Sequence, residues 1–270
     1  MTQNMLQPIL GATMDRHTLD AFLGGRLQLM QPEAGHRAGL DAVMLAAAAP
    51  VAIGARVLDV GCGIGVVGLC IATRVADCRL TGLDINPELV VLANDNAARN
   101  GLADRYLAVR GDLTGPHANI EVVGLKRESF DVVVANPPFY GEGRATAAPA
   151  ADRARANVMP EGGLEQWIRF MATMTKPGGR IAIVHLAEAL GELLDLLDGR
   201  FGAISVFPLY PRDGEPAHRV IITARKASRA GLTLKQGMVL HGAGNTFTPE
   251  AEAVLRHGAA ISMKPRRDDP

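Results

Sequence analysis

Four consecutive residues, Asn136-Pro137-Pro138-Phe139, have the types needed to hold a flat amino nitrogen. The side-chain oxygen of Asn136 can accept a hydrogen bond from an amine. The two prolines stiffen the turn and present carbonyls without competing N–H donors. Phe139 can stack on a planar group. The plainer alternative is a proline-rich turn that follows a strand.

The chemistry of a planar amine explains this choice of residues. The lone pair of such a nitrogen is delocalised into its ring, so the nitrogen is a poor nucleophile. Two acceptors, the Asn136 side chain and the Pro137 carbonyl, could hold the amine hydrogens and aim the lone pair at an electrophile. Catalysis of this kind depends mainly on positioning and electrostatics. The motif therefore predicts Asn136, Pro137 and Phe139 as catalytic residues, without a Ser–His–Asp or Cys–His set.

A glycine-rich stretch, DVGCGIG over 59–65, predicts a cofactor site. Gly61 and Gly63 let the chain turn sharply and approach a ligand closely. Nucleotide-binding domains that hold NAD have similar glycines. Asp59 argues against NAD because a carboxylate at the turn would repel a pyrophosphate. A sulfonium ligand that carries an amino group would be attracted to it, and S-adenosylmethionine is such a ligand.

Two further acids follow predicted strands. Asp84 lies 25 residues after Asp59 and could accept both ribose hydroxyls of the cofactor, although an acid just before Pro87 could instead cap a helix. Asp112 could accept a hydrogen bond from the adenine amine, or could simply end a strand. The predicted cofactor-binding residues are Asp59, Gly61, Gly63, Asp84, Ile85, Asp112, Leu113 and Asn136.

The elements that must position these residues alternate between strand and helix. A β-branched run at 130–136 suits a central buried strand. Alternation of this kind predicts a parallel sheet covered by helices on both faces. Only a short link separates strands 203–210 and 218–225, so these two should be antiparallel. The expected fold is α/β and Rossmann-like, with a seven-stranded mostly parallel sheet and an antiparallel last hairpin. The other predicted strands are 56–60, 79–84, 105–112 and 180–186, and the predicted helices are 40–49, 64–76, 87–101, 164–176, 187–198 and 249–257.

Three parts of the chain are predicted. Residues 1–52 form an N-terminal extension or lid with a hairpin at 23–32 and one helix, and residues before about 20 look frayed. Residues 53–227 form the core domain, in which segments 114–127 and 140–163 look mobile. Residues 228–270 form a basic extension that packs on the core.

Charge is uneven along the 270 residues, although the formal net charge is zero. From Arg200 onward there are 11 Lys and Arg against 6 Asp and Glu, and the preceding residues carry 17 against 22. A basic C-terminal third is typical of a surface that faces a polyanion, and ordinary variation in surface charge is the alternative. The three cysteines lack metal-ligand spacing, and we expect no metal site. We see no signal peptide or membrane span and expect a cytoplasmic protein.

The order DVGCGIG, LDINP, GDL and NPPF resembles that of class I methyltransferases with an (Asn/Asp)-Pro-Pro-aromatic motif, over residues 55–225. Stretches outside that core, GRLQLMQPEAGHRAGLDAVMLAAAA and AHRVIITARK, resemble the bacterial tRNA(Val) adenine-N6 methyltransferases. In that family a G-x-D sequence precedes the core, and Gly39, Leu40 and Asp41 match its spacing, with Leu where Thr is more usual. The resemblance implies that the acids and glycines bind S-adenosylmethionine and that Asn136, Pro137 and Phe139 grip a base.

The substrate implied is therefore RNA, with tRNA favoured, methylated at the N6 amine of an adenine. Two alternatives share this core: a protein glutamine-amide methyltransferase and a ribosomal RNA guanine-N2 methyltransferase. The first usually has a longer helical N-terminal domain, and the second often duplicates the core. A monomer is favoured. Predicted substrate-binding residues, each of which could instead be an ordinary loop or surface residue, are Pro138, Tyr140, Arg144 and Arg219.

Overall fold

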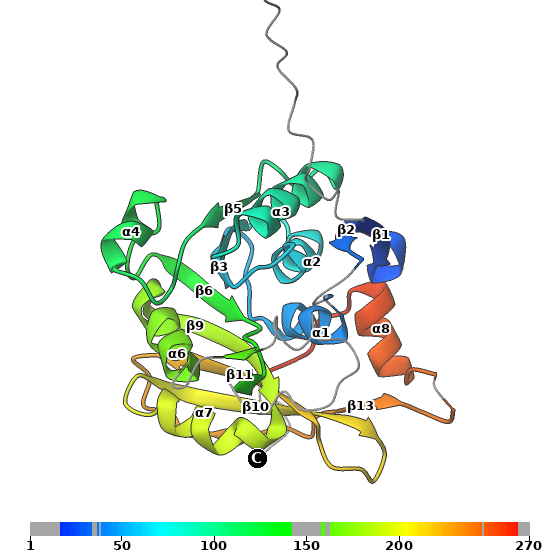
Figure 1. Cartoon of the computed structure of the whole chain (residues 1–270). Coiled ribbons are helices and arrows are strands. Elements are labelled where there is room, and N and C mark those ends of the chain that lie inside the picture. Colours follow the sequence, from blue (N-terminus) through cyan, green and yellow to red (C-terminus); the bar gives the residue numbers. More distant parts are fainter. Residues whose placement is uncertain are drawn as a thin grey trace, which may run out of the picture.

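A twisted sheet divides the molecule into two layers of helices (Figure 1). The computed structural model describes residues 17–33, 37, 39–141, 158–159, 163–244 and 246–263, with the backbone alone at 140–141 and 158–159. Within these residues the main sheet has nine strands in the order β12-β10-β11-β9-β6-β3-β4-β5, and β13 also pairs with β10.

The parallel half of the sheet contains the motifs. β6 (Phe130–Ala135) lies between β3 (Arg56–Val60) and β9 (Thr175–Leu186), and is parallel to both. β4 (Arg79–Asp84) and β5 (Tyr106–Arg110) follow on the other side of β3. The chain thus winds outward from β3 to β5 and then returns to place β6 on the opposite side of β3. Such a reversal opens a crevice at the carboxyl ends of the strands.

The last hairpin is antiparallel, as predicted. β11 (Arg219–Lys226) lies between β10 (Phe201–Arg212) and β9, and is antiparallel to both. The predicted seven strands are all present, but the count of seven is too low. Two short strands from the C-terminal segment, β12 (Thr233–Leu234) and β13 (Met238–His241), pair with β10 in parallel. Their few residues carried too weak an alternation to be predicted as strands.

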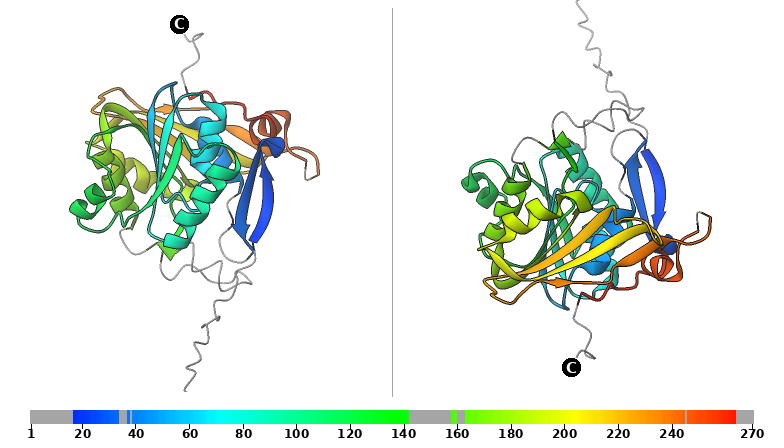
Figure 2. Two further views of the ribbon diagram at one scale, coloured as in Figure 1. Left: turned by 90° about the horizontal axis from the view of Figure 1, so that it is seen from above. Right: turned by 90° about the horizontal axis from the view of Figure 1, so that it is seen from below.

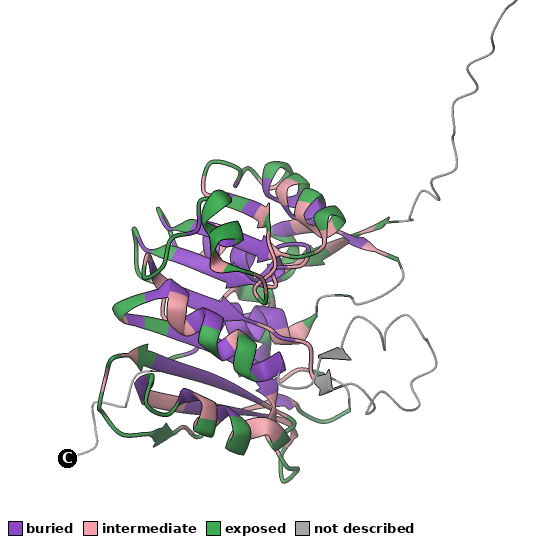
Figure 3. Cartoon of the chain, turned by 60° about the vertical axis from the view of Figure 1, so that its left-hand side comes forward, coloured by how far each residue is buried: buried purple, intermediate pink, exposed green. Residues whose placement is uncertain are grey.

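Helices cover both faces of the sheet and bury two apolar cores. Figure 3 shows the buried strands between the partly exposed helices. One face carries α1 (Leu40–Ala48), α2 (Val66–Arg74) and α3 (Pro87–Arg99), with α8 (Pro249–His257) beside α1. The other face carries α4 (His117–Val122), α6 (Gly163–Met174) and, after a single 3-10 turn at Ala187–Ala189, α7 (Leu190–Leu197).

The N-terminal hairpin is larger than predicted. β1 (His17–Phe22) pairs with β2 (Leu27–Pro32), and a 3-10 turn, Leu23–Gly25, connects them. The prediction wrongly began the hairpin at residue 23. Gly24 and Gly25 have positive φ angles of 67° and 92°, so these residues form the turn. Figure 2 shows this hairpin standing beside the main sheet.

Two other expectations need correction. Segment 114–127 is not a plain loop, because it contains α4, which buries Ile120 against the sheet. Helix α6 ends at Met174, and the following Pro-Gly-Gly stretch belongs to the first part of β9. Most of segment 140–163 lies outside the described residues.

The segment around and after α8 contacts both α1 and the N-terminal hairpin. The backbone N–H of Ile261 donates to the carbonyl of Ala47 at 2.9 Å. Arg26, in the hairpin turn, donates to the carbonyl of His257 at 3.1 Å. None of the helices in the described parts of the chain has the length and apolar character needed to cross a bilayer.

Candidate active site

The sheet edge formed by the carboxyl ends of β3, β4, β5 and β6 gathers the predicted site residues. Asp59 lies near the end of β3, Asp84 ends β4, Asp112 follows β5, and Asn136 follows β6. These four strands are neighbours in the sheet, so the four residues lie at the same end of it although they come from four separate stretches of sequence. Motifs that are separated along the sequence are therefore neighbours in the folded protein.

The glycine loop after β3 is fastened to the end of β4. The backbone N–H groups of Gly61 and Cys62 both donate to the carbonyl of Leu83, at 2.7 and 3.0 Å. Gly61 and Gly63 have φ angles of 66° and 53°. A β-carbon at Gly63 would meet nothing within 4 Å, so the loop backbone faces open space there. A ligand can therefore approach the main chain closely.

Asp84 holds this loop in place. Its two carboxylate oxygens accept from the N–H of Gly63 at 2.8 Å and from the N–H of Asn86 at 2.9 Å. Each oxygen keeps a further lone pair for a ribose hydroxyl. The alternative role as helix cap is wrong, because the side chain of Asn86 caps α3 by accepting from Glu88. Ile85 is 60% exposed beside Asp84, where an apolar side chain can cover a flat ring.

Asp59 is a buried carboxyl behind the glycine loop. One oxygen accepts from the N–H of Gly68 at 3.0 Å. Burial raises the pKa of Asp59 to about 7; the hydrogen bond from Gly68 opposes this shift, and the nearby charge of Asp84 adds to it. A positively charged ligand at the loop would favour the ionised form. The pair of acids thus suits a cationic cofactor.

Asp112 and Leu113 close the cofactor side of the crevice. One oxygen of Asp112 accepts from both the N–H and the hydroxyl of Thr114, at 2.8 and 2.7 Å, which fixes the carboxylate. Leu113 packs against the second apolar core. The N–H of Gly111 donates to the carbonyl of Asp84 at 2.9 Å and holds this turn against β4. The arrangement leaves the other Asp112 oxygen to accept from an amine.

The oxygen of the Asn136 side chain is buried and has no hydrogen-bond partner among the described residues. Pro137 beside it is buried as well. A buried acceptor without a donor costs about 1–3 kcal/mol, so such a group needs a local explanation. An amine hydrogen from a substrate would satisfy it. This is the role that the sequence predicted for Asn136.

Phe139 is surrounded by side chains from two other strands. The guanidinium carbon of Arg219, at the start of β11, lies 4.6 Å from the centre of the Phe139 ring. The ring of His185, near the end of β9, meets Phe139 edge-on with centroids 5.4 Å apart. Arg219 is also paired with Asp41 of α1, at 3.2 Å. Arg219 thus reaches the motif, but as a partner of Phe139 and Asp41.

His185 was missed in the sequence. Its ring is buried, and burial lowers its pKa to about 4; the Pro138 carbonyl opposes this shift, and the charge of Arg219 adds to it. Neither ring nitrogen makes a well-formed hydrogen bond with a described residue. The imidazole is therefore neutral at physiological pH. A polar residue at the end of an apolar strand beside the motif was the signal that could have identified it.

Trp167 of α6 was also missed. A β-carbon at Gly61 would collide with the six-membered ring of Trp167, so the indole lies against the glycine loop. Only a residue without a side chain fits between this ring and the crevice. Nothing in the sequence near Trp167 predicts the contact, because the two residues meet through packing of α6 across the sheet.

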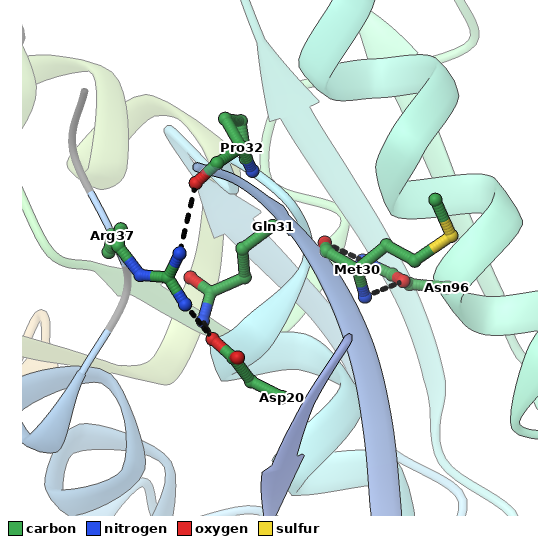
Figure 4. Close-up of polar contacts among 6 residues, drawn as sticks. All are labelled: Asp20, Met30, Gln31, Pro32, Arg37 and Asn96. Carbon is green, nitrogen blue, oxygen red and sulfur yellow. Dashed lines mark hydrogen bonds and ion pairs between the residues drawn. The ribbon is translucent and has the colours of Figure 1, made fainter. Parts of the chain in front are cut away.

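Asparagines on α3 attach the N-terminal hairpin to the cofactor side. Asn96 accepts from the N–H of Met30 at 2.7 Å and donates to the Met30 carbonyl at 3.1 Å, as a neighbouring strand would (Figure 4). It also donates to the carbonyl of Ile64 in the glycine loop at 3.1 Å. One turn later, Asn100 makes the same pair of bonds to Gln28, both at 2.9 Å.

Polar contacts close the outer end of this hairpin. Asp20 of β1 pairs with Arg37 and accepts from the amide of Gln31 at 2.6 Å. Arg37 also donates to the carbonyl of Pro32 at 3.2 Å. Figure 4 shows these side chains converging between the hairpin and residue 37. Arg37 is thereby held against the hairpin.

The other predicted substrate-binding residues follow Asn136 in the chain. Pro138 lies in the motif, half-buried. Tyr140 is described by its backbone alone, and Arg144 lies outside the described residues. A role in substrate binding stays a prediction for these residues and for Arg219.

The strand order and its reversal beside β3 are those of a Rossmann-like methyltransferase fold, and the acids beside the glycine loop lie at the end of the sheet where such folds bind their ligands. A family profile described as methyltransferase small domain matches residues 39–206, and the chain belongs to this family. S-adenosylmethionine is the methyl donor of such enzymes, and the two acids and the open glycine loop fit a cationic nucleoside.

Particular relatives are also similar. A tRNA1(Val) (adenine(37)-N6)-methyltransferase from Porphyromonas gingivalis is 31% identical over 178 residues, which cover 64% of this chain and 68% of the relative. The enzyme of the same name from Aeromonas hydrophila is 28% identical over 217 residues, covering 78% and 85%. The solved structure of a predicted O-methyltransferase from Agrobacterium tumefaciens has a TM-score of 0.68 at 26% identity, covering 82% of this chain and 98% of that one.

Proposed function

We propose that this protein transfers a methyl group from S-adenosylmethionine to the exocyclic N6 amine of an adenine in tRNA. The observation that carries the proposal is the buried, unpartnered oxygen of Asn136 in the Asn-Pro-Pro-Phe turn. The relatives named as tRNA1(Val) (adenine(37)-N6)-methyltransferases support adenine 37 of that tRNA as the target.

In the proposed reaction the chain positions both reactants. The cofactor supplies an electrophilic methyl group. Asp84 would accept hydrogen bonds from the ribose hydroxyls of the cofactor, and Asp112 would accept one from its adenine amine. The ionised Asp59 would attract the positively charged cofactor. The base to be methylated stacks on Phe139, and its amine hydrogens point to the Asn136 oxygen and the Pro137 carbonyl.

Holding both hydrogens in this way pulls the amine towards a tetrahedral geometry and aims its lone pair at the methyl group. No strong base is needed before transfer, because the nitrogen becomes acidic once methylated and releases a proton to water. Of the two described side chains against Phe139, His185 is neutral and Arg219 is paired with Asp41, so neither is an unpaired cation that would repel a developing positive charge.

The remaining expectations belong to this proposal. Residues 1–52 would form an N-terminal extension or lid, 53–227 the methyltransferase domain, and 228–270 a basic extension that packs on the core. The protein would act as a monomer in the cytoplasm. Tyr140, Arg144 and Arg219 would lie on the RNA side of the crevice.

The test is transfer of labelled methyl groups. Purified protein and tritiated S-adenosylmethionine are offered bulk tRNA, ribosomal RNA and soluble protein from cells that lack the gene. Label in tRNA that digests to N6-methyladenosine supports the proposal. Label in protein as methylglutamine, in ribosomal RNA as methylguanosine, or on a hydroxyl oxygen would contradict the assigned acceptor.

A further inference from the structure

The ring of Phe139 is held by side chains that come from three elements outside its own turn. Arg219 of β11 lies over its face, and His185 of β9 meets it edge-on, with an interplanar angle of 83°. Asp41 of α1 binds the guanidinium of Arg219. We call Asp41, Arg219 and His185 the ring clamp.

The ion pair in the ring clamp is partly shielded from solvent. The side chains of Arg219 and Asp41 are 26% and 23% exposed, and their atoms approach to 3.2 Å. A guanidinium is planar and can stack on an aromatic ring while it binds a carboxylate through its edge. Asp41 therefore fixes the position of Arg219, and through it the plane in which Phe139 lies.

Burying the imidazole of His185 costs desolvation free energy that an apolar ring of similar size would not. A buried imidazole whose nitrogens make no well-formed hydrogen bond regains only part of the solvation that it loses, whereas a phenyl ring has no such solvation to lose. The ring lies where the Pro138 carbonyl and the Phe139 ring meet it together. Unsatisfied buried polar groups in native proteins call for a local function.

We propose that Asp41 and His185 are positioning residues for the methyl transfer: they set the orientation of the Phe139 ring, Asp41 through Arg219 and His185 by direct contact. The inference rests on the proposed function for the role of Phe139 in stacking on the acceptor. It also gives the N-terminal helix α1 a part in catalysis, because Asp41 lies in its first turn.

The first experiment needs no acceptor. 4-Fluorophenylalanine is placed at position 139 of the full chain, and its fluorine resonance is recorded with S-adenosylmethionine present. Asp41→Asn, Arg219→Lys and His185→Ala should each shift or broaden the line. Asp131→Asn alters an ion pair with Lys176 at the amino end of β6, far along the strand from the motif, and should leave the fluorine line unchanged. An unmoved line in Asp41→Asn would overturn the role of Asp41, and an unmoved line in His185→Ala that of His185.

The second experiment measures coupling. Asp41→Asn should lower kcat/KM for the acceptor about tenfold, and Asp41→Glu should restore part of the loss. Combined with Phe139→Leu, the same change should cost less than about twofold, because a residue that acts only through the ring loses its target. Fully additive losses would contradict the proposal. The Kd for S-adenosylmethionine should stay within about twofold, and a larger change would assign Asp41 to cofactor binding instead.

Conservative variants complete the test. His185→Phe keeps a ring against Phe139 and should retain more activity than His185→Ala. Arg225→Lys, on the same strand as Arg219 but bonded to Gly178, should behave as wild type. The cycle is measured on whichever acceptor takes the label, so a wrong RNA target and a wrong ring clamp give different results.

Discussion

The two sides of the crevice are built in different ways. On the cofactor side, Asp59 binds the N–H of a residue nine positions away, and Asp84 binds that of Gly63, 21 positions away. On the acceptor side, Asp41 and Arg219 are 178 positions apart and meet at Phe139. The first side is assembled within successive strand–helix–strand units. The second requires the complete sheet.

This difference has a physical cause. Consecutive parallel strands place their following loops side by side, so a strand-end acid and a glycine loop meet without help from the rest of the chain. The acceptor side uses β6, β9, β11 and α1, and Arg219 reaches Phe139 only because β11 pairs with β9, which in turn pairs with β6. Changes on the cofactor side should therefore affect binding alone, and changes on the acceptor side should affect turnover alone.

The largest expected effect is that of Asn136→Ala. Loss of the amine acceptor should lower kcat by about 100- to 1,000-fold, the range seen when one preorganised hydrogen-bonding group is removed from a transition state. The Kd for S-adenosylmethionine should stay within about threefold, as measured by calorimetry. If cofactor affinity and kcat fell by similar factors, the separation into a cofactor side and an acceptor side would be wrong.

Asp84→Ala should produce the reverse pattern. It removes the ribose acceptor and also frees the Gly63 loop, so the Kd for S-adenosylmethionine should rise by roughly 30- to 100-fold, corresponding to about 2–3 kcal/mol for hydrogen bonds to a charged group. At saturating cofactor, kcat should remain within about threefold of wild type. The matched change Asp112→Ala should weaken binding less, because its carboxylate does not hold the glycine loop.

Asn96→Ala tests the hydrogen bonds that join α3, on the cofactor side, to the N-terminal hairpin. Asn96 is fully buried and satisfies both backbone groups of Met30, so its loss should lower the free energy of unfolding by about 2 kcal/mol. Chemical denaturation measures this change. Limited proteolysis should cut within residues 17–32 sooner than in wild type. Asn94→Ala, which frees Ala108 of β5 instead, is the control and should leave the hairpin resistant.

The smallest effect concerns pH. Because cofactor binding favours ionised Asp59, affinity for S-adenosylmethionine should rise about tenfold between pH 5.5 and pH 7, and Asp59→Asn should flatten this dependence. Without cofactor the sign for stability is opposite. The folded state retains a proton that the unfolded carboxyl has lost, so the contribution of Asp59 to stability falls as the pH rises from about 4 to about 7. Titration calorimetry and thermal unfolding across this range measure the two slopes.

Some of these features could be predicted from the sequence and others could not. The positions of Asp59, Asp84 and Asn136 at or beside strand ends could be predicted because the apolar pattern of each strand is clear in the sequence. The helix α8 was also predicted correctly, since Thr248 and Pro249 open it and Gly258 ends it. Strands β12 and β13 could not be predicted, because β10 alone decides that these few residues pair.

The sequence by itself determined the strand–helix alternation, the glycine loop, the acids and the Asn-Pro-Pro-Phe turn, because each depends on the local preferences of a few neighbouring residues. Only the tertiary structure decided that Arg219 and His185 meet Phe139, that Trp167 lies on Gly61, and that Asn96 holds the hairpin. Those contacts join residues far apart in the chain, and a local sequence pattern does not specify which distant side chain will pack against a given residue. They form because the closed sheet and its two helix layers leave each of these side chains one place to pack.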